Sequence, residues 1–432
     1  MRSNKLSSFK TIYPVSLGCP KNKSDFEKLL YVLQKRGYQF TLDPEEADTF
    51  WINTCAFIRP AVEESIDHIL ELAELKKNNQ KLIVSGCLPA RYSEEELKEL
   101  FPEVDEFYGI EPFRYFSEEE PTEKILTESP FYAYLKISEG CNHRCSYCTI
   151  PKIRGPFRSK PKELLLKEAE NLLKQGVKEI ILVGQDITFY GKDLGKRQGL
   201  LELLKELAFL PYDFRIRLLY LHPGHLTKSF IEELFSLPKV LPYFDIPIQH
   251  AHSQVLKKMK RFYEPEQILE IIDFIRKEKP FASIRTTIIT GFPGEGEKEF
   301  FYLIEFLKNA KFDYLGVFPF YPEEGTPASK FEEKVPYREK LKRKREILKI
   351  QREITKERLK ERVGLEEEVL ILGVNGKNKY YGISQGQAPE IDGITYVLLK
   401  KACAPNPGEL LKVKIVKSGI YDLWAEPLDL RG

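Results

Sequence analysis

Three cysteines within eight residues, Cys141, Cys145 and Cys148, are the residues of this sequence best suited to bind a metal. They supply three thiolates, whereas a structural zinc site closes with four ligands and iron–sulfur clusters are commonly held by four cysteines. The missing fourth ligand favours a cluster with one iron left open to another molecule. A zinc site completed by His143 and buried thiols without a metal are the alternatives. His143 is an awkward fourth ligand because it lies between the cysteines, and chance clustering is disfavoured because the chain has only seven cysteines.

Residues 141–148, CNHRCSYC, resemble the Cys-x-x-x-Cys-x-aromatic-Cys signature of the radical S-adenosylmethionine (SAM) enzymes. In that family the open iron is chelated by the amino and carboxylate groups of SAM, and reductive cleavage of SAM gives a 5′-deoxyadenosyl radical. The resemblance implies a 4Fe-4S cluster and SAM as cofactors, and it places Tyr147 near the adenine. A tyrosine of the hydrophobic core is the alternative for Tyr147.

A second set of cysteines follows the strands that we expect in the first part of the chain. Cys19, Cys55 and Cys87 each come just after the carboxyl end of an expected strand. In a parallel sheet these ends share one edge, where open α/β sheets bind their ligands. We therefore expect a second three-cysteine cluster, the alternative being three separately buried cysteines. Expected strands at 11–17, 49–53, 81–85 and 104–108 alternate with helical patterns at 24–36, 61–75 and 93–100, which predicts an α/β domain with a largely parallel sheet.

Two three-cysteine sites in one chain resemble the methylthiotransferases, radical SAM enzymes that insert sulfur and a methyl group at an unactivated C–H bond. The resemblance covers essentially the whole chain. Residues 16–22 (SLGCPKN), 53–58 (NTCAFI) and 150–155 (IPKIRG) are similar to the RimO type, which modifies a ribosomal protein. The sequence departs from that type at 23–27 (KSDFE), where apolar-apolar-Asp-Ser-Glu is usual, and at 89–90 (PA), where Ala-Gln is commoner. Neither departure falls on an expected ligand.

The resemblance implies addition of a methylthio group to the β-carbon of an aspartate in the twelfth small-subunit ribosomal protein, uS12. One 4Fe-4S cluster, at Cys141, Cys145 and Cys148, would serve radical formation, and a second, at Cys19, Cys55 and Cys87, would deliver the sulfur. A reductant such as flavodoxin or ferredoxin and a sulfide or persulfide source are the implied partners. No catalytic residue is assigned beyond the cluster ligands. A tRNA methylthiotransferase acting on an adenosine beside the anticodon, and a non-catalytic iron–sulfur or zinc module, are the competing hypotheses.

The middle of the chain shows six strand–helix repeats, which predict the partial (βα)6 TIM-like barrel of a radical SAM core, with its site at the C-terminal face. By resemblance, Gly184 and Gln185 follow the second strand, where a turn contacts the SAM amino group, and Gln249 ends the fourth. Arg217 and Arg285 could bind the SAM carboxylate or the substrate, an ion pair being the alternative for each. Four histidines, His222, His225, His250 and His252, are dispersed, and we expect capping or packing roles for them. The strands are expected at 132–138, 179–183, 214–220, 243–248, 283–289 and 314–320, and the helices at 162–174, 200–207, 227–235, 265–277 and 297–308.

The last part of the chain predicts a basic helix and a small antiparallel β-barrel that resembles a TRAM domain. The helix, at 334–362, is expected to pack across the central barrel, with an RNA-binding arm as the alternative. Residues 366–432 carry eight basic and nine acidic residues, which fits a basic protein partner better than RNA. Cys403 is expected to be a structural thiol. The tail strands are expected at 368–374, 380–384, 395–399, 410–416 and 421–426.

Composition and charge limit the possible partners and the cellular location of the protein. Lys and Arg number 67 against 65 Asp and Glu, so no global basic excess demands nucleic acid. No apolar run approaches a membrane span, and clustered cysteines without a signal sequence indicate a cytoplasmic metal-binding protein. We expect a multidomain α/β chain with domains at 1–129, 130–362 and 363–432, joined first by an irregular acidic linker at 112–130.

Overall fold

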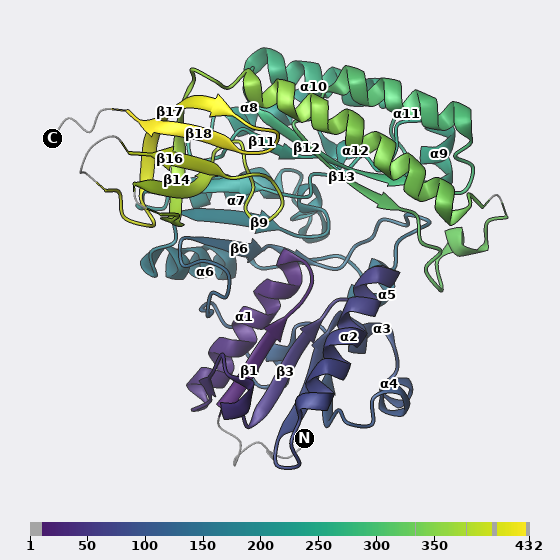
Figure 1. The fold of residues 1–432 in the computed structure, drawn as a ribbon, viewed down its shortest axis with the longest axis vertical. Helices are drawn as coiled ribbons and strands as arrows, with labels where there is room; N and C mark the ends of the chain where they lie inside the picture. The colour runs from purple at the N-terminus through teal and green to yellow at the C-terminus, as the bar shows by residue number, and fades with distance from the viewer. Residues whose placement is uncertain (1–10, 333, 377, 400–403, 429–432) are drawn as a thin grey trace. The chain divides into compact units, whose positions relative to one another are not determined.

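The computed structural model describes residues 11–332, 334–376, 378–399 and 404–428. The chain forms two compact units (Figure 1). The first contains the residues up to Glu128 together with 134–143 and 148–171, and the second contains 129–133, 144–147 and the residues from Leu172 onward. The cysteine loop at 141–148 thus has its two ends in the first unit and its middle in the second. The expected boundaries at 129 and 362 stay predictions.

A parallel five-stranded sheet, in the order β2-β1-β3-β4-β5, forms the centre of the first unit. The four expected strands are confirmed, and β2 is a short edge strand that the sequence pattern did not indicate. The strands are β1 (Thr11–Ser16), β2 (Gln39–Phe40), β3 (Thr49–Thr54), β4 (Lys81–Gly86) and β5 (Glu106–Tyr108).

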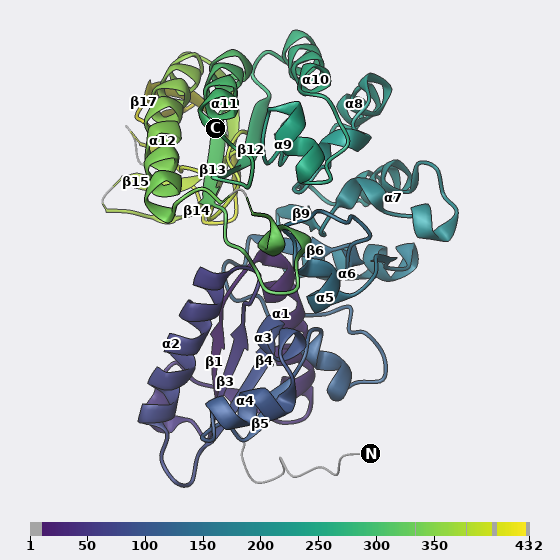
Figure 2. The same ribbon diagram turned by 90° about the vertical axis from the view of Figure 1, so that its right-hand side faces the viewer.

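Helices α1 (Pro20–Lys35) and α2 (Arg59–Leu75) cover opposite faces of this sheet (Figure 2). Because successive strand residues point to opposite faces, Trp51 packs with the core beneath α1, whereas its neighbours Phe50 and Ile52 pack with the core beneath α2. Helix α1 begins earlier than expected, directly after Cys19, since Pro20 suits the first helical position. The unit also contains α3 (Cys87–Arg91), α4 (Glu94–Leu100), α5 (Ile150–Arg154), β7 (Ser138–Glu139), β8 (Arg158–Ser159) and most of α6 (Lys162–Lys174).

The expected linker at 112–130 contains the short 3₁₀ helix η2 (Pro112–Tyr115) and no strand. It is nevertheless tied into the first unit. Buried Lys124 lies 3.4 Å from the Glu27 carboxylate, and Glu120 lies 2.7 Å from the ammonium of buried Lys28. Ion pairs therefore hold this acidic segment against the domain.

All six strands expected for the central barrel are present and form two three-stranded sheets, β10-β9-β6 and β11-β12-β13. Strand β9 pairs with β10 in parallel, as β12 does with β11 and β13. Helices α10, α11 and α12 lie on the outer side of β12 and β13 (Figure 1). The strands are β6 (Tyr132–Lys136), β9 (Glu179–Val183), β10 (Arg215–Leu218), β11 (Tyr243–Asp245), β12 (Ser283–Thr290) and β13 (Tyr314–Pro319). The helices are α7 (Gly199–Ala208), α8 (Lys228–Phe235), α9 (Ser253–Lys258), α10 (Pro265–Glu278), α11 (Glu297–Ala310) and α12 (Tyr337–Lys360).

Five strands at the C-terminal end close into a barrel in the order β14-β15-β16-β18-β17, as expected. The barrel is not wholly antiparallel, because β16 pairs with β18 in parallel, with Thr395 opposite Leu423. The strands are β14 (Glu366–Val374), β15 (Lys379–Ser384), β16 (Thr395–Leu398), β17 (Leu410–Ser418) and β18 (Leu423–Pro427). Cys403 lies outside the described residues, so its expected role is not tested.

Helix α12 packs across β13 and β12, which confirms the position expected for the basic segment. Ile347 and Ile354, on its inner face, are buried. None of the described helices has the length and apolar character that crossing a membrane requires.

Candidate active site

Cys19, Cys55 and Cys87 lie at the carboxyl edge of the N-terminal sheet, after β1, β3 and β4. Gly18 and Gly86 precede two of them with φ values of +96° and +97°, a region that favours glycine. A Cβ at Gly18 would lie 2.9 Å from Cβ of Cys55, so the turn carrying Cys19 passes against Cys55. The sheet thus brings together cysteines that are more than thirty residues apart in sequence.

The thiols of this edge influence one another electrostatically. Burial raises the pKa of Cys55 to about 12, and neighbouring Cys87 and Cys19 add to the rise. Burial also raises the pKa of Cys87. For Cys19 burial acts in the same sense, but Lys21 and Arg154 outweigh it and lower the pKa. None of the three forms a disulfide, so all three thiols can serve as ligands of a metal group that binds thiolates on one side.

Asparagine side chains hold the cysteine-bearing turns together. The Asn22 amide nitrogen donates to the carbonyls of Leu17 (2.9 Å) and Thr54 (3.0 Å), which flank the first two cysteines. Asn53 donates in turn to the carbonyl of Asn22 at 3.1 Å. Hydrogen bonds thereby connect the SLGCPKN and NTCAFI segments noted in the sequence at this edge of the sheet.

Arg154 is the residue of this edge that sequence reasoning missed as a functional candidate. It lies in α5, six residues after Cys148, and its side chain is 1% exposed. Its guanidinium donates to Sγ of Cys87 at 3.5 Å and to the Asn22 oxygen at 3.3 Å. The other guanidinium nitrogen donates to Glu139 at 2.9 Å. The resemblance of residues 150–155 to the RimO type was the one signal that pointed here.

A buried charge network continues from Arg154. Lys136, 1% exposed, contacts Asp25 and lies 2.7 Å from Glu139 and 3.2 Å from Glu111. Burial opposes the charged form of Glu139, but Lys136 and Arg154 outweigh it and lower the pKa to about 2. Burial dominates at Asp25 and raises its pKa. The network places the Arg154 cation beside the thiols, where its charge favours the anionic thiolate form that binds a metal.

The loop at 141–148 is anchored at its first end within the first unit. Gly140 has a φ of +69°, and a Cβ there would lie 2.1 Å from the carbonyl oxygen of Pro156. The Cys141 amide donates to the carbonyl of Gly155 at 3.1 Å. The amide of His143 donates to Sγ of Cys141 at 3.4 Å.

The middle of that loop is held within the second unit. The Ser146 amide donates to Met259 at 3.1 Å, and the guanidinium of Arg261 lies 3.9 Å from Sγ of Cys145. Tyr147 is partly buried, with its ring 6.3 Å from that of Phe292 in an edge-to-face arrangement. This packing matches the core alternative for Tyr147, and contact with an adenine stays a prediction.

The last cysteine of the loop is tied to the second cysteine set. Thr149 directly follows Cys148, and its hydroxyl donates at 2.9 Å to the carbonyl of Phe57, two residues after Cys55. Covalent geometry then keeps the Cα atoms of Cys148 and Cys55 within about 20 Å of each other. The first unit therefore contains five of the six expected ligands, all except Cys145.

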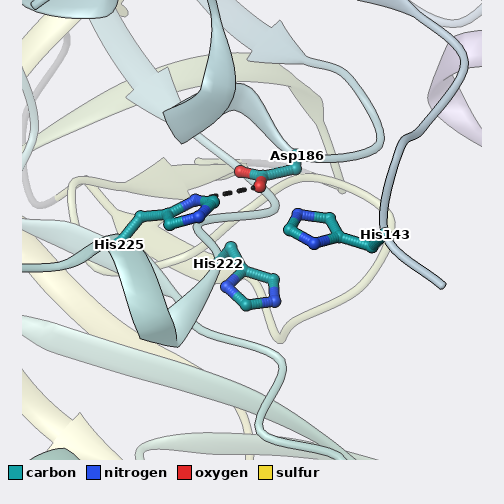
Figure 3. Close-up of side chains that lie close together, drawn as sticks. All are labelled: His143, Asp186, His222 and His225. Carbon is teal, nitrogen blue, oxygen red and sulfur yellow. Dashed lines mark ion pairs between the residues drawn. The ribbon is translucent and has the colours of Figure 1, made fainter. Parts of the chain in front are cut away.

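The carboxyl edge of the central barrel carries Gly184 and Gln185 directly after β9, with Gly184 buried and Gln185 half-buried. The next residue, Asp186, forms an ion pair with His225 at 3.1 Å, and His222 stands beside it (Figure 3). Gln249 has a φ of 63°, and its backbone bridges to β12 at Ile288. Cofactor contacts of Gly184, Gln185 and Gln249 stay predictions.

The expected capping roles of the histidines are confirmed in part. His222 and His252 accept from the amides of Gly224 and Gln254 at the starts of η5 (Pro223–His225) and α9. Their expected dispersion is wrong for two pairs. The rings of His222 and His225 lie 4.8 Å apart, and the amide of His252 donates to Nδ1 of His250 at 2.9 Å. Strands β9 and β10 are adjacent, so the loops after them meet.

Arg217 and Arg285 both have buried acidic partners. Arg217 is fully buried and bonds Glu179 at 2.6 Å, and it also donates to the carbonyls of Gln385 (3.0 Å) and Ser384 (3.2 Å). These contacts join β10 to the C-terminal barrel. Arg285 lies 3.1 Å from Asp245 and 3.5 Å from Asp392. The arrangement matches the ion-pair alternative for both arginines, and none of these contacts tests the expected binding of the SAM carboxylate.

Replacement of Arg217 distinguishes a role in the buried ion pair from a role in binding the SAM carboxylate. Arg217→Met should lower the free energy of unfolding by about 3–5 kcal/mol, because it leaves Glu179 buried with one partner fewer, and it should leave SAM affinity unchanged. Urea unfolding and equilibrium SAM binding measure the two effects. Glu179→Gln is the matched variant, which breaks the same pair from the other side. Weaker SAM binding by folded Arg217→Met, with Glu179→Gln unaffected, would assign the arginine to the cofactor instead.

Family models match three stretches of the chain. The radical SAM superfamily model matches residues 135–307, a model described as uncharacterized protein family UPF0004 matches residues 11–109, and the TRAM domain model matches residues 363–428. The first stretch includes β9 to β12, the second includes the N-terminal sheet and the third includes the C-terminal barrel.

Two curated relatives match over nearly their full length. The ribosomal protein uS12 methylthiotransferase RimO of Carboxydothermus hydrogenoformans is 42% identical, over 95% of this chain and 98% of the relative. The protein of the same name from Aquifex aeolicus is 44% identical, over 96% and 98%. Among solved structures, the radical SAM methyltransferase TsrM from Kitasatospora setae, with cobalamin and a [4Fe-4S] cluster, aligns with a TM-score of 0.52. It is 13% identical over 74% of this chain and 77% of TsrM, which shows a common fold.

Proposed function

Because this chain belongs to the RimO family of ribosomal protein uS12 methylthiotransferases, we propose that it adds a methylthio group to the β-carbon of an aspartate of uS12. The chain is a radical SAM enzyme whose cofactors are SAM and 4Fe-4S clusters. The observation that carries the proposal is the convergence of buried Cys55 and Cys87 with half-buried Cys19 at the edge of the N-terminal sheet, beside Arg154.

The two cysteine sets have separate tasks in this proposal. Cys141, Cys145 and Cys148 hold the cluster that binds SAM, and Cys19, Cys55 and Cys87 hold the cluster for sulfur insertion. When bound, these cofactors supply hydrogen abstraction and sulfur transfer, and the protein orients them. Gly140 lets the first loop close against Pro156, and Gly18 lets the second set close. Thr149 limits the separation of Cys148 from Cys55.

The other site residues of the proposal line the carboxyl edge of the central barrel. Gly184 and Gln185 contact SAM after β9, Gln249 lies on the same face, and Tyr147 lies near the adenine. The proposal also keeps the domain boundaries 1–129, 130–362 and 363–432.

The proposed partners follow from the reaction. SAM cleavage needs an electron, so a flavodoxin or ferredoxin is the proposed reductant, and the inserted sulfur comes from a sulfide or persulfide source. Because uS12 is a ribosomal protein, the proposed location is the cytoplasm. The names of the relatives favour this substrate over tRNA.

Anaerobic turnover tests the substrate. The chain with reconstituted clusters, SAM and a reductant receives either a uS12 peptide or anticodon-stem RNA, and mass spectrometry follows both. We expect a gain of about 46 Da on the peptide aspartate, the mass of a methylthio group replacing hydrogen in this cofactor-borne chemistry. A peptide with asparagine at that position is the control. The same gain on RNA alone would support the methylthiotransferase chemistry and refute the uS12 substrate.

A further inference from the structure

Six basic residues form one row along the outer face of α12. They are spaced alternately four and three positions apart, the spacing that places side chains in line on a helix. All six are exposed, and the row spans about 27 Å at 1.5 Å per residue. The row, called here the α12 stripe, consists of Arg338, Lys342, Arg345, Lys349, Arg352 and Lys356.

The buried basic residues of the same helix have a different function. Arg343 lies 2.7 Å from Glu295, and Arg358 lies 3.1 Å from Asp313. Lys340 donates to the carbonyl of Phe320 at 2.8 Å. These three fasten α12 to the elements beneath it. Packing therefore explains the inner basic residues and leaves the α12 stripe unexplained.

Four members of the α12 stripe lack an acidic partner. Among the residues that the structure describes, no carboxylate lies within ion-pair distance of Arg338, Arg345, Lys349 or Arg352. The other two members have distant pairs within the helix, of 3.7 Å for Lys342 and 4.0 Å for Lys356.

Exposed pairs on other helices are closer, such as Arg59–Glu63 at 2.8 Å and Lys98–Glu94 at 2.7 Å. On α12, by contrast, like charges stand at the i,i+3 and i,i+4 positions, where they destabilise a helix. An anionic partner would relieve this repulsion along the whole row.

We propose that the α12 stripe binds the phosphate backbone of ribosomal RNA beside uS12, so that the protein recognises its substrate within a small-subunit particle. The proposal rests on the proposed function, which makes a ribosomal protein the substrate. A row of unpaired cations complements a row of phosphates, and such contacts position a protein without reading sequence. The whole chain has a net charge of only +2, so the attraction is local to this face.

An anionic membrane surface fits the α12 stripe less well. Helices that lie on membranes expose an apolar face next to their basic one. On α12 the apolar residues Ile347 and Ile354 are buried against the barrel and are not available for insertion. A phosphate backbone needs no such apolar face.

The test compares two triple variants on two substrates. Arg345→Gln/Lys349→Gln/Arg352→Gln removes the centre of the α12 stripe. Lys228→Gln/Lys277→Gln/Lys298→Gln removes the same charge from exposed positions on α8, α10 and α11. Binding to unmodified small ribosomal subunits is measured at several salt concentrations, and methylthiolation is measured on those subunits and on a free uS12 peptide. Thermal unfolding confirms that both variants are folded.

We expect the stripe variant to lose salt-dependent binding to the subunit. The slope of log K against log salt should fall by about two to three, at roughly 0.7–0.9 per lost phosphate contact. Turnover on subunits should fall with it, while turnover on the peptide and all properties of the control variant stay unchanged.

Several outcomes would overturn the proposal. An unchanged salt slope in the stripe variant would do so, as would equal losses in both triple variants. Equal loss of turnover on the free peptide would assign the α12 stripe to uS12 itself. Binding of the wild-type protein to phosphatidylserine vesicles but not to subunits would assign it to a membrane. If the wild type methylthiolates neither the peptide nor the subunits, the proposed function fails, whereas the binding measurement still decides the role of the stripe.

Discussion

Replacing Cys19, Cys55 or Cys87 by alanine is expected to abolish methylthio insertion into uS12, while cleavage of SAM to 5′-deoxyadenosine persists at a reduced rate. Each variant removes one of the three thiols that the N-terminal sheet brings together at its carboxyl edge. A cluster held by three cysteines has no spare protein ligand, so the loss of one should release it. The three cysteines of the 141–148 loop stay in place, so SAM is still bound.

Two measurements besides turnover test this expectation. Anaerobic iron analysis should fall by about four atoms per chain, the content of one 4Fe-4S cluster, and the second cluster's spectrum should disappear. Cys141→Ala is the opposite variant and should lose SAM cleavage and insertion together. Cys403→Ala, which changes a cysteine outside both sets, is the matched control and should lose neither. Loss of both activities in folded Cys19→Ala would contradict separate tasks for the two sets.

The second large effect is expected from Arg154→Met. The guanidinium lies within 3.5 Å of Cys87, Asn22, Asp25 and Glu139, and the site is buried. Removal leaves the two carboxylates with Lys136 as their remaining buried cation. Breaking a buried pair in this way costs about 3–5 kcal/mol. Urea unfolding of the cluster-free chain should show a loss of that size.

Two variants control this measurement. Arg158→Met, four residues away, removes an arginine that is 60% exposed and 3.8 Å from Glu111, and exposed pairs contribute at most about 1 kcal/mol. Arg154→Lys keeps the charge but loses the planar fork that serves several acceptors at once, so an intermediate loss is expected. Combining Arg154→Met with Asp25→Asn should recover part of the stability. An unfolding midpoint unchanged in Arg154→Met would refute the supporting role of the network.

Helix α5, which carries Arg154, and the preceding Thr149 connect the two cysteine sets within the first unit. Helix α5 follows the 141–148 loop directly, and Ile153 of this helix packs in the core that contains Cys87. Thr149 binds the carbonyl of Phe57, next to the turn of Cys55. Any movement of the C-terminal end of the first loop is therefore resisted by contacts with the second cysteine set.

Several features of this protein are determined by short stretches of sequence. The cysteine spacing at 141–148 is local, and the loop can close around one metal group wherever the chain places it. Strand–helix alternation is local as well, and the C-terminal ends of parallel strands share one edge, so the convergence of Cys19, Cys55 and Cys87 could be predicted. The five strands of the C-terminal barrel follow from their alternating pattern and turn residues.

Tertiary structure decided the features that depend on residues far apart in the chain. Arg217 meets Gln385 across 168 residues, and Arg154 meets Cys87 across 67. No pattern near either arginine signals such partners, because a guanidinium has the same local sequence signature whether it faces a cofactor or a carboxylate. The parallel pairing of β16 with β18 likewise depends on closing the barrel, and not on either strand.

Helix α12 combines features that its own sequence sets with features that depend on tertiary structure. Its 3.6-residue periodicity and its charge are set by the sequence, so a basic helix was predictable. Which of its basic residues are paired was decided by the acids that β12, β13 and their loops bring beneath it, such as Glu295 and Asp313. Only after those pairs form is the α12 stripe distinguishable from the other basic residues, because burial and ion pairing require neighbours that the linear sequence does not specify.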